Sequence, residues 1–291
     1  LLAWPTMGEF ERATAVEPGE RPGRYRAEIA EGWDIGGNAN GGYLLAIAAR
    51  ALVAATGRPA PVSLTAHYLS PGQPGRLDID TTVIREGRRF ATATATLSAA
   101  GRPVLTALGT FGEPGGGPGN IEVASWVDGG PPDLPPPEDC AGDPDRAEAA
   151  AAVAIQQPPS FATRVEQRLH PEDIGFFRGE PTGEARIRGW FRLRNGEPMD
   201  AIALTCAIDA FPPTIFNLDL PVGWTPTLEL TVHVRRRPAP GWLACAFTTR
   251  FVTDGLLEED GEIWDSEGHL VAQGRQLALV PRPTGTVPSG L

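Results

Sequence analysis

Three polar residues in the second half of the chain, Asp209, Thr227 and Gln276, carry side chains that together could hold and activate a water molecule. Asp209 stands between Ile208 and Ala210 at the end of an apolar helical segment, where the helix dipole disfavours a carboxylate by roughly 0.3–1 kcal/mol. It is therefore either a solvated helix end or a functional group. A carboxylate, a hydroxyl and an amide around one point can polarise a water for attack on a carbonyl group, and amides at a helix start can bind the oxyanion.

Gln276 stands out because the chain repeats itself. When the segments that begin at Gly101 and Gly268 are aligned, Gln276 falls opposite Gly109, so the second copy has an amide where the first has no side chain. Thr227 opens a predicted strand, and threonine is common in strands for its shape alone. Thr227 becomes a candidate site residue only if it lies close to Asp209 and Gln276 in the folded chain.

Two apolar helical segments must position these groups. The first, Asn38–Gly57, is apolar on nearly every face, is too short to cross a bilayer, and has cap residues at Asn38 and Asn40 and a stop at Gly57. Such a helix has to be wrapped by other elements. The second segment, Met199–Phe211, has the same character and ends at a pair of prolines.

Strand-like runs surround each predicted helix in the same order, and the sequence SLTAH of the first copy is echoed by ELTVH in the second. This shared order predicts two copies of one unit. Each copy is expected to be an α+β arrangement, with a buried helix inside a curved antiparallel sheet. We expect an N-terminal repeat over residues 1–112, a Pro/Gly-rich linker over 113–160 with a short helix at Asp145–Gln156, and a C-terminal repeat over 161–291. The predicted strands are Arg24–Ile29, Val62–Leu69, Leu77–Arg85, Arg89–Ser98, Val104–Phe111, Phe161–Leu169, Ala185–Leu193, Thr227–Arg235, Trp242–Phe251, Leu256–Trp264 and Leu270–Val280.

Composition narrows the choice of partners and compartment. The chain has 291 residues and a formal net charge of −11, which argues against a general nucleic-acid or anionic-membrane binder. Its three cysteines lie far apart without metal-ligand spacing, as free thiols in a reducing compartment do. The first residues lack the charged start and long apolar stretch of a signal peptide, so we expect a cytoplasmic protein.

Other residue clusters have simpler interpretations. The glycines before the first helix, including Gly41 and Gly42, match no phosphate-binding motif and favour a tight connection into the helix. His67 and His233 occupy equivalent repeat positions, which favours a structural role. No histidine or acidic group has metal-ligand spacing, and we expect no metal site. The acidic groups Glu258–Asp260 and Asp265–Glu267 are expected to be solvated hairpin ends.

The dense basic spot Arg235–Arg237 leaves two possibilities open. It is either a solvated strand end or, through Arg235 and Arg236, a contact for ligand phosphates.

The segments ANGGYLLAIAARAL, SLTAHYLSPGQPG, REGRRFATATATL and GRPVLTALGTF resemble the first half of acyl-CoA thioesterase II (TesB-like) proteins. The segments AIDAFPP, PTLELTVHVRRRP and SEGHLVAQGRQLALV resemble the second half. The resemblance implies the double hotdog fold and hydrolysis of a fatty acyl-CoA, or a related thioester, without a cofactor. It also implies that Asp209, Thr227 and Gln276 hold the attacking water.

With these roles assigned, we expect backbone amides near Gly41 and Gly42, or at the start of the second predicted helix, to bind the oxyanion. We also expect the chain to form a homodimer or higher homo-oligomer. Two alternatives stay open: a hydratase or dehydratase of the same fold, which would need an Asp–His pair, and a non-catalytic protein that binds an acyl ligand.

Overall fold

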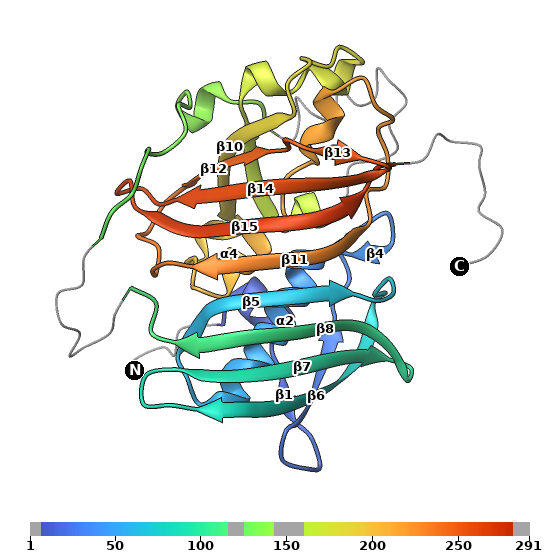
Figure 1. Cartoon of the computed structure of the whole chain (residues 1–291), viewed down its shortest axis with the longest axis vertical. Helices are drawn as coiled ribbons and strands as arrows, with labels where there is room; N and C mark the ends of the chain where they lie inside the picture. The colour runs from blue at the N-terminus through green and yellow to red at the C-terminus, as the bar shows by residue number, and fades with distance from the viewer. Residues whose placement is uncertain (1–6, 116–124, 143–159, 282–291) are drawn as a thin grey trace.

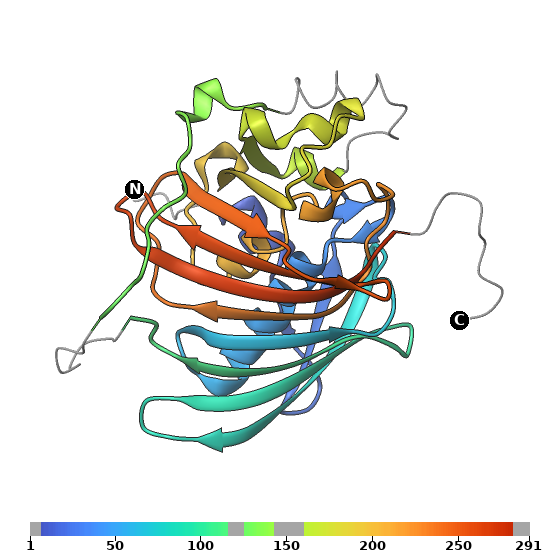
Figure 2. The same ribbon diagram turned by 45° about the horizontal axis from the view of Figure 1, so that its top comes forward.

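One continuous antiparallel sheet joins both halves of the molecule. The computed structural model describes residues 7–115, 125–142 and 160–281. Within them, the sheet has 13 strands in the order β1-β2-β6-β7-β8-β5-β11-β15-β14-β12-β10-β9, with β13 paired to β14, and a separate hairpin joins β3 to β4. The two repeats lie side by side along this sheet (Figure 1), which curves around the helices behind it (Figure 2).

The elements of the first repeat follow the predicted order, and the predicted strands agree with the observed ones to within two residues at each end. They are α1 (Glu9–Ala13), β1 (Glu17–Pro18), β2 (Arg24–Ile29), β3 (Asp34–Ile35), β4 (Asn38–Ala39), α2 (Gly41–Thr56), β5 (Ala60–Tyr68), β6 (Gly75–Glu86), β7 (Ala91–Ala99) and β8 (Arg102–Gly112).

The second repeat contains shorter and more interrupted elements. Its strands are β9 (Val165–Leu169), β10 (Arg186–Leu193), β11 (Thr227–Val234), β12 (Leu243–Thr248), β13 (Val252–Thr253), β14 (Leu256–Trp264) and β15 (Leu270–Leu279), and its α-helix is α4 (Ala203–Ala207). Turns of 3-10 helix lie at η1 (Pro137–Asp139), η2 (Ser160–Thr163), η3 (Pro171–Asp173), η4 (Gly175–Arg178), η5 (Arg194–Gly196) and η6 (Thr214–Asn217).

Helix α2 is the centre of the first repeat, as its sequence indicates. The side-chain oxygen of Asn40 caps it by accepting the N–H of Tyr43 at 2.9 Å, and Gly57 ends it with a left-handed φ of 62°. Every residue from Gly42 to Ala49 is buried, so the helix has no solvated face over this stretch. Asn38 does not cap the helix, because it lies in β4.

Helix α4 is shorter than the predicted Met199–Phe211. The carboxylate of Asp200 accepts the N–H groups of Ile202 at 2.9 Å and Ala203 at 2.7 Å, which delays the start of the helix. The chain after α4 continues as turns, so Asp209 lies two residues beyond the helix and not within its last turn. The groups that neighbour this carboxylate therefore decide its state.

The repeats meet where β5 pairs with β11. Thr65 lies directly opposite Thr231, and their hydroxyl oxygens are 2.8 Å apart. These two residues hold equivalent places in the repeat, so the pair marks a local two-fold relation between the halves. The pairing with the next strand agrees, because Leu64 faces Gly109 just as Leu230 faces Gln276.

The described part of the linker packs on the second repeat. Ala141 exchanges backbone hydrogen bonds with Leu169 of β9 at 2.9 Å, and the Trp190 indole N–H donates to the Pro135 carbonyl at 2.8 Å. The predicted helix at 145–156 lies outside the described residues. The three cysteines are free and buried.

Among the described residues, no helix has the length and apolar character needed to cross a membrane.

Candidate active site

The carboxylate of Asp209 lies against the beginning of α2, which belongs to the other repeat. Its Oδ2 accepts the backbone N–H of Gly42 at 2.7 Å and the side-chain amide of Asn40 at 3.1 Å. Asn40 also donates to the Asp209 backbone carbonyl at 2.8 Å. Asn40 therefore caps α2 with its oxygen and holds Asp209 with its nitrogen, a double role that the sequence did not reveal.

Gly42 makes this contact possible because it has no side chain. A Cβ there would lie 2.7 Å from the Thr205 carbonyl oxygen and 2.9 Å from the Asp209 Cβ, so α2 and α4 could not approach as closely. The role of Gly41 and Gly42 as oxyanion donors stays a prediction, although both backbone amides contact Asp209 in this structure. The Gly42 N–H is already engaged by Asp209, and Gly41 also contributes a backbone hydrogen bond to that carboxylate.

Thr227 reaches the inside of the sheet through a β-bulge. In simple alternation from the buried Leu230, Thr227 would point outward, but the register of β11 on β15 shifts between Thr227 and Glu229. Thr227 thus lies opposite Ala278, which is fully buried, and cross-strand partners face the same side of a sheet. Its hydroxyl donates to the Gln276 Oε1 at 3.1 Å.

Gln276 is bound on its other side by Glu259, which corrects the expectation that the Glu258–Asp260 group is a solvated hairpin end. Glu259 is only 5% exposed, lies opposite Gln276 across β14 and β15, and accepts its Nε2–H at 3.1 Å. The second carboxylate oxygen accepts the N–H of Thr214 at 2.7 Å. A signal for this was present in the sequence, since the alternation of Leu257, Glu259, Gly261 and Ile263 places Glu259 on the apolar face.

The two carboxylates hold their protons more tightly than usual. Burial raises the pKa of Asp209 to about 6, although the hydrogen bonds from Gly42, Asn40 and Gly41 oppose this rise. Burial raises the pKa of Glu259 to about 7, and the charge of Asp209 adds to the rise. Asp209 makes no direct hydrogen bond to Thr227 or Gln276 in the described structure. It stands close enough to Glu259 for their charges to interact.

The basic residues lie away from this cluster. Arg235 follows the far end of β11, roughly 25 Å along the strand from Thr227, and its guanidinium donates to the Gln273 Oε1 at 2.8 and 3.0 Å. Arg236 is exposed. Contact of Arg235 or Arg236 with ligand phosphates stays a prediction, and it requires a ligand that runs the length of β11.

The histidines do not approach Asp209. His67 lies opposite Glu229 and His233 opposite Ser63, on the exposed face of the sheet. Among the described residues, no hydrogen bond or ion pair joins a histidine to Asp209. The Asp–His pair that a hydratase would need is therefore not formed by these groups.

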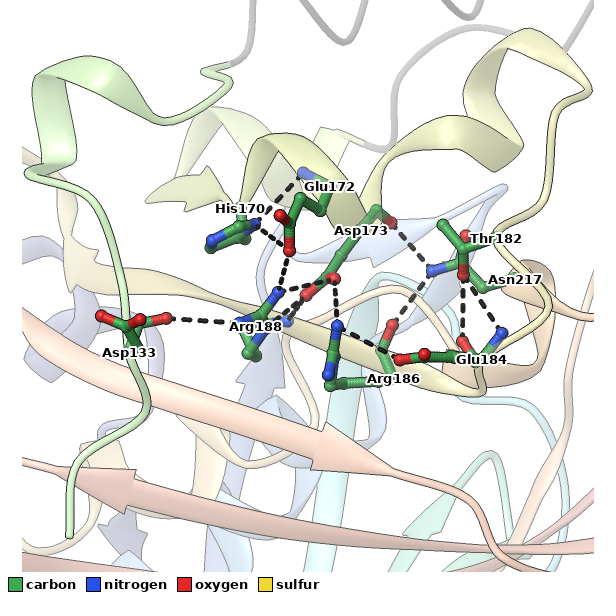
Figure 3. Close-up of polar contacts among 9 residues, drawn as sticks. All are labelled: Asp133, His170, Glu172, Asp173, Thr182, Glu184, Arg186, Arg188 and Asn217. Carbon is green, nitrogen blue, oxygen red and sulfur yellow. Dashed lines mark hydrogen bonds and ion pairs between the residues drawn. The ribbon is translucent and has the colours of Figure 1, made fainter.

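A second polar cluster, formed around η3 and β10, has the donor types of a metal site (Figure 3). Ligand atoms of His170, Glu172 and Asp173 lie within 4.8 Å of one another. The guanidinium of Arg188 donates to the Asp173 carboxylate at 2.9 and 3.1 Å and to Glu172 at 3.1 Å, and His170 Nδ1 accepts the N–H of Glu172. These contacts pair both carboxylates with the Arg188 guanidinium.

Comparison with known proteins agrees with the arrangement of the two repeats. Residues 29–112 match the family model for the acyl-CoA thioesterase N-terminal domain, and residues 137–280 match that for the acyl-CoA thioesterase C-terminal domain. An uncharacterized protein of Mycobacterium tuberculosis is 30% identical over 288 residues, which covers 94% of this chain and 98% of that protein.

Solved structures share the fold. A crystal structure from Thermobifida fusca with a provisional thioesterase II assignment has a TM-score of 0.81 and 31% identity, covering 95% of this chain and 98% of that one. A hotdog-fold protein of Alicyclobacillus acidocaldarius has a TM-score of 0.80 at 23% identity, covering 96% and 100% of the two chains. The predicted double hotdog is confirmed, and the chain belongs to the acyl-CoA thioesterase family.

Proposed function

We propose that this protein hydrolyses an acyl-CoA thioester to the free acid and CoA, with Asp209 as the general base. The observation that carries the proposal is the hydrogen-bonded chain from Thr227 through Gln276 to Glu259 on the inner face of the sheet, whose Glu259 carboxylate interacts with the charge of Asp209. Membership in the acyl-CoA thioesterase family supports the choice of substrate class.

The hydrogen bonds already made in the protein determine how a water would be held. The Thr227 hydroxyl gives its proton to Gln276, so its oxygen is left to accept a proton from water. Gln276 gives one N–H to Glu259 and keeps a second to donate. A water that donates to Asp209 and Thr227 and accepts from Gln276 has one lone pair left, and this pair attacks the thioester carbonyl carbon.

The reaction then proceeds by ordinary acyl transfer to water. As the new C–O bond forms, Asp209 takes a proton from the water and the carbonyl π electrons move onto the carbonyl oxygen. When the carbonyl re-forms, the C–S bond breaks, and the departing CoA sulfur receives the proton held by Asp209. A pKa of about 6 suits this cycle, because Asp209 is ionised near neutral pH yet basic enough to accept a proton.

A thiol-release assay over acyl-CoA substrates of increasing chain length tests the proposal. The wild-type protein should release CoA, and Asp209→Asn should reduce kcat by 10²-fold or more, on the order of the contribution of a general base. Gln276→Ala should reduce kcat as well. Binding of acyl-CoA with no thiol release would favour a non-catalytic acyl-binding protein. Hydrolysis that is indifferent to both substitutions would show that the reaction occurs elsewhere.

A further inference from the structure

Tyr68 carries a buried hydroxyl group that makes no hydrogen bond with any described residue. Such groups are rare in proteins, since a hydroxyl removed from water without a partner destabilises the folded state. Tyr43 shows the usual arrangement in this fold. Its hydroxyl donates to the Ala13 carbonyl at 2.8 Å and accepts the Ala30 N–H at 3.0 Å. The isolated hydroxyl of Tyr68 therefore needs an explanation.

The position of Tyr68 supplies one, because its ring stands at the edge of the Asp209 site. Tyr68 alternates with the buried Leu64 and Ala66 along β5 and so faces the helices. A Cβ built on Gly41 would lie 3.1 Å from Cζ of Tyr68 and 2.9 Å from Oδ2 of Asp209, so the phenol ring and the carboxylate both approach the backbone at the start of α2.

The sheet also brings Tyr68 next to Thr227. The pairing of β5 with β11 ends where His67 faces Glu229, so the next residue on β5, Tyr68, lies beside the bulge that turns Thr227 inward. Tyr68 is thus a residue of the first repeat placed against the polar groups of the second.

The other hydrogen-bond donors at the site are largely committed. The Gly42 N–H and the Asn40 side-chain amide serve Asp209, and the Thr227 hydroxyl serves Gln276. In the proposed reaction a negative charge develops on the carbonyl oxygen and needs a donor of its own. Burial and the charges of Asp209 and Glu229 raise the pKa of the Tyr68 phenol, so it keeps its proton at neutral pH.

We propose that Tyr68 is a catalytic residue whose hydroxyl donates a hydrogen bond to the carbonyl oxygen of the thioester and to the oxyanion that forms from it. The proposal rests on the thioesterase function argued above. No proton is transferred in this contact, since the phenol stabilises the oxyanion and retains its hydrogen throughout. The first repeat would then supply the oxyanion donor, and the second repeat would hold the attacking water.

Tyr68→Phe tests this role, with Tyr43→Phe as the matched control. Removal of the Tyr68 hydroxyl breaks no hydrogen bond with a described residue, so the Tm should stay equal or rise, while kcat should fall about 10²-fold, as for loss of one oxyanion donor. Tyr43→Phe loses the hydrogen bonds of its hydroxyl with Ala13, Ala30 and Glu28 and should lower the Tm with kcat near the wild-type value. A thioether analogue of the substrate, which has no carbonyl oxygen, should bind wild type and Tyr68→Phe with equal affinity.

The outcomes separate the two proposals. If wild-type protein releases thiol and Tyr68→Phe keeps the wild-type kcat, the role of Tyr68 is wrong and the thioesterase proposal stands. A raised KM at unchanged kcat also overturns it, because an oxyanion donor acts in the transition state. If wild-type protein releases no thiol from any acyl-CoA tested, the thioesterase function itself fails.

Discussion

The carboxylate of Glu259 accepts the side-chain N–H of Gln276 at 3.1 Å, and this contact decides which end of the amide faces Thr227. With the nitrogen held by a carboxylate, the amide oxygen points to the Thr227 hydroxyl and accepts its proton. The Thr227 oxygen is then oriented as an acceptor. Glu259 is therefore a positioning residue: it acts on the proposed water through Gln276 and Thr227.

Replacement of Glu259 by leucine should disturb this order. Glu259→Leu retains a side chain of similar size but removes the acceptor, so the Gln276 amide can rotate and kcat should fall by up to about 100-fold. Glu259→Gln keeps one acceptor oxygen and should recover part of the rate. Steady-state kinetics checks both variants, with Glu262→Leu on the exposed face of β14 as the control. Equal kcat for Glu259→Leu and wild type would contradict the positioning role.

The rate of hydrolysis should depend on pH through Asp209. If the ionised carboxylate is the base, as we propose, its pKa of about 6 means that kcat/KM should decrease tenfold per pH unit below about pH 6. Asn40→Asp keeps the oxygen that caps α2 but replaces the amide donor with a like charge, which raises the pKa of Asp209 further. The acidic limb of the profile should therefore move to higher pH. If the acidic limb stays at the same pH in this variant, ionisation of Asp209 is not its cause.

Stability should fall with rising pH because of Glu259. Its pKa rises from the ordinary 4.5 to about 7 on folding, so between these values the folded state binds a proton that the unfolded state has lost. The free energy of unfolding should accordingly decrease as pH rises through this range, by about 3 kcal/mol at most, and Asp209 acts in the same direction. Urea denaturation at about pH 5 and about pH 8 measures the change, which should be smaller in Glu259→Gln. An equal change in both proteins would assign the pH dependence to other groups.

Gly42 should tolerate no side chain. Gly42→Ala places a Cβ within 3.0 Å of Thr205, Cys206 and Asp209, so the start of α2 must move and its hydrogen bond to the carboxylate must lengthen. We expect a loss of about 1–3 kcal/mol in stability and a lower kcat. Gly130→Ala is the control, since nothing lies within 4 Å of a Cβ there. Thermal unfolding and thiol release measured on both variants would show whether the close approach is required.

Most of the fold was predictable because its signals are local. The buried helix around Tyr43–Ala49 and the strands β6 and β7 can be predicted from the pattern of apolar residues within each segment alone. The short α4 was not predicted, because the Asp200 carboxylate caps a later residue than the apolar pattern suggests.

The site was predictable only in part, because its geometry depends on contacts between distant segments. The resemblance to a known family indicated Asp209, Thr227 and Gln276, yet the bulge that turns Thr227 inward leaves no pattern in a single strand. Glu259 was missed because three consecutive acidic residues are typical of a solvated segment, although they lie within the predicted strand Leu256–Trp264. The partnership of Tyr68 with the second repeat arises only when β5 and β11 pair.

The two-fold relation centred on Thr65 and Thr231 has a consequence for stoichiometry. Symmetry would offer a reaction centre in each half, but at Gly109, the counterpart of Gln276, an added Cβ would lie 2.6 Å from Leu64 and 2.8 Å from Phe111. No amide fits there. A slow, tight inhibitor that mimics the tetrahedral intermediate should therefore titrate one equivalent per chain, and an assembly of several chains should contain as many working centres as it has polypeptides.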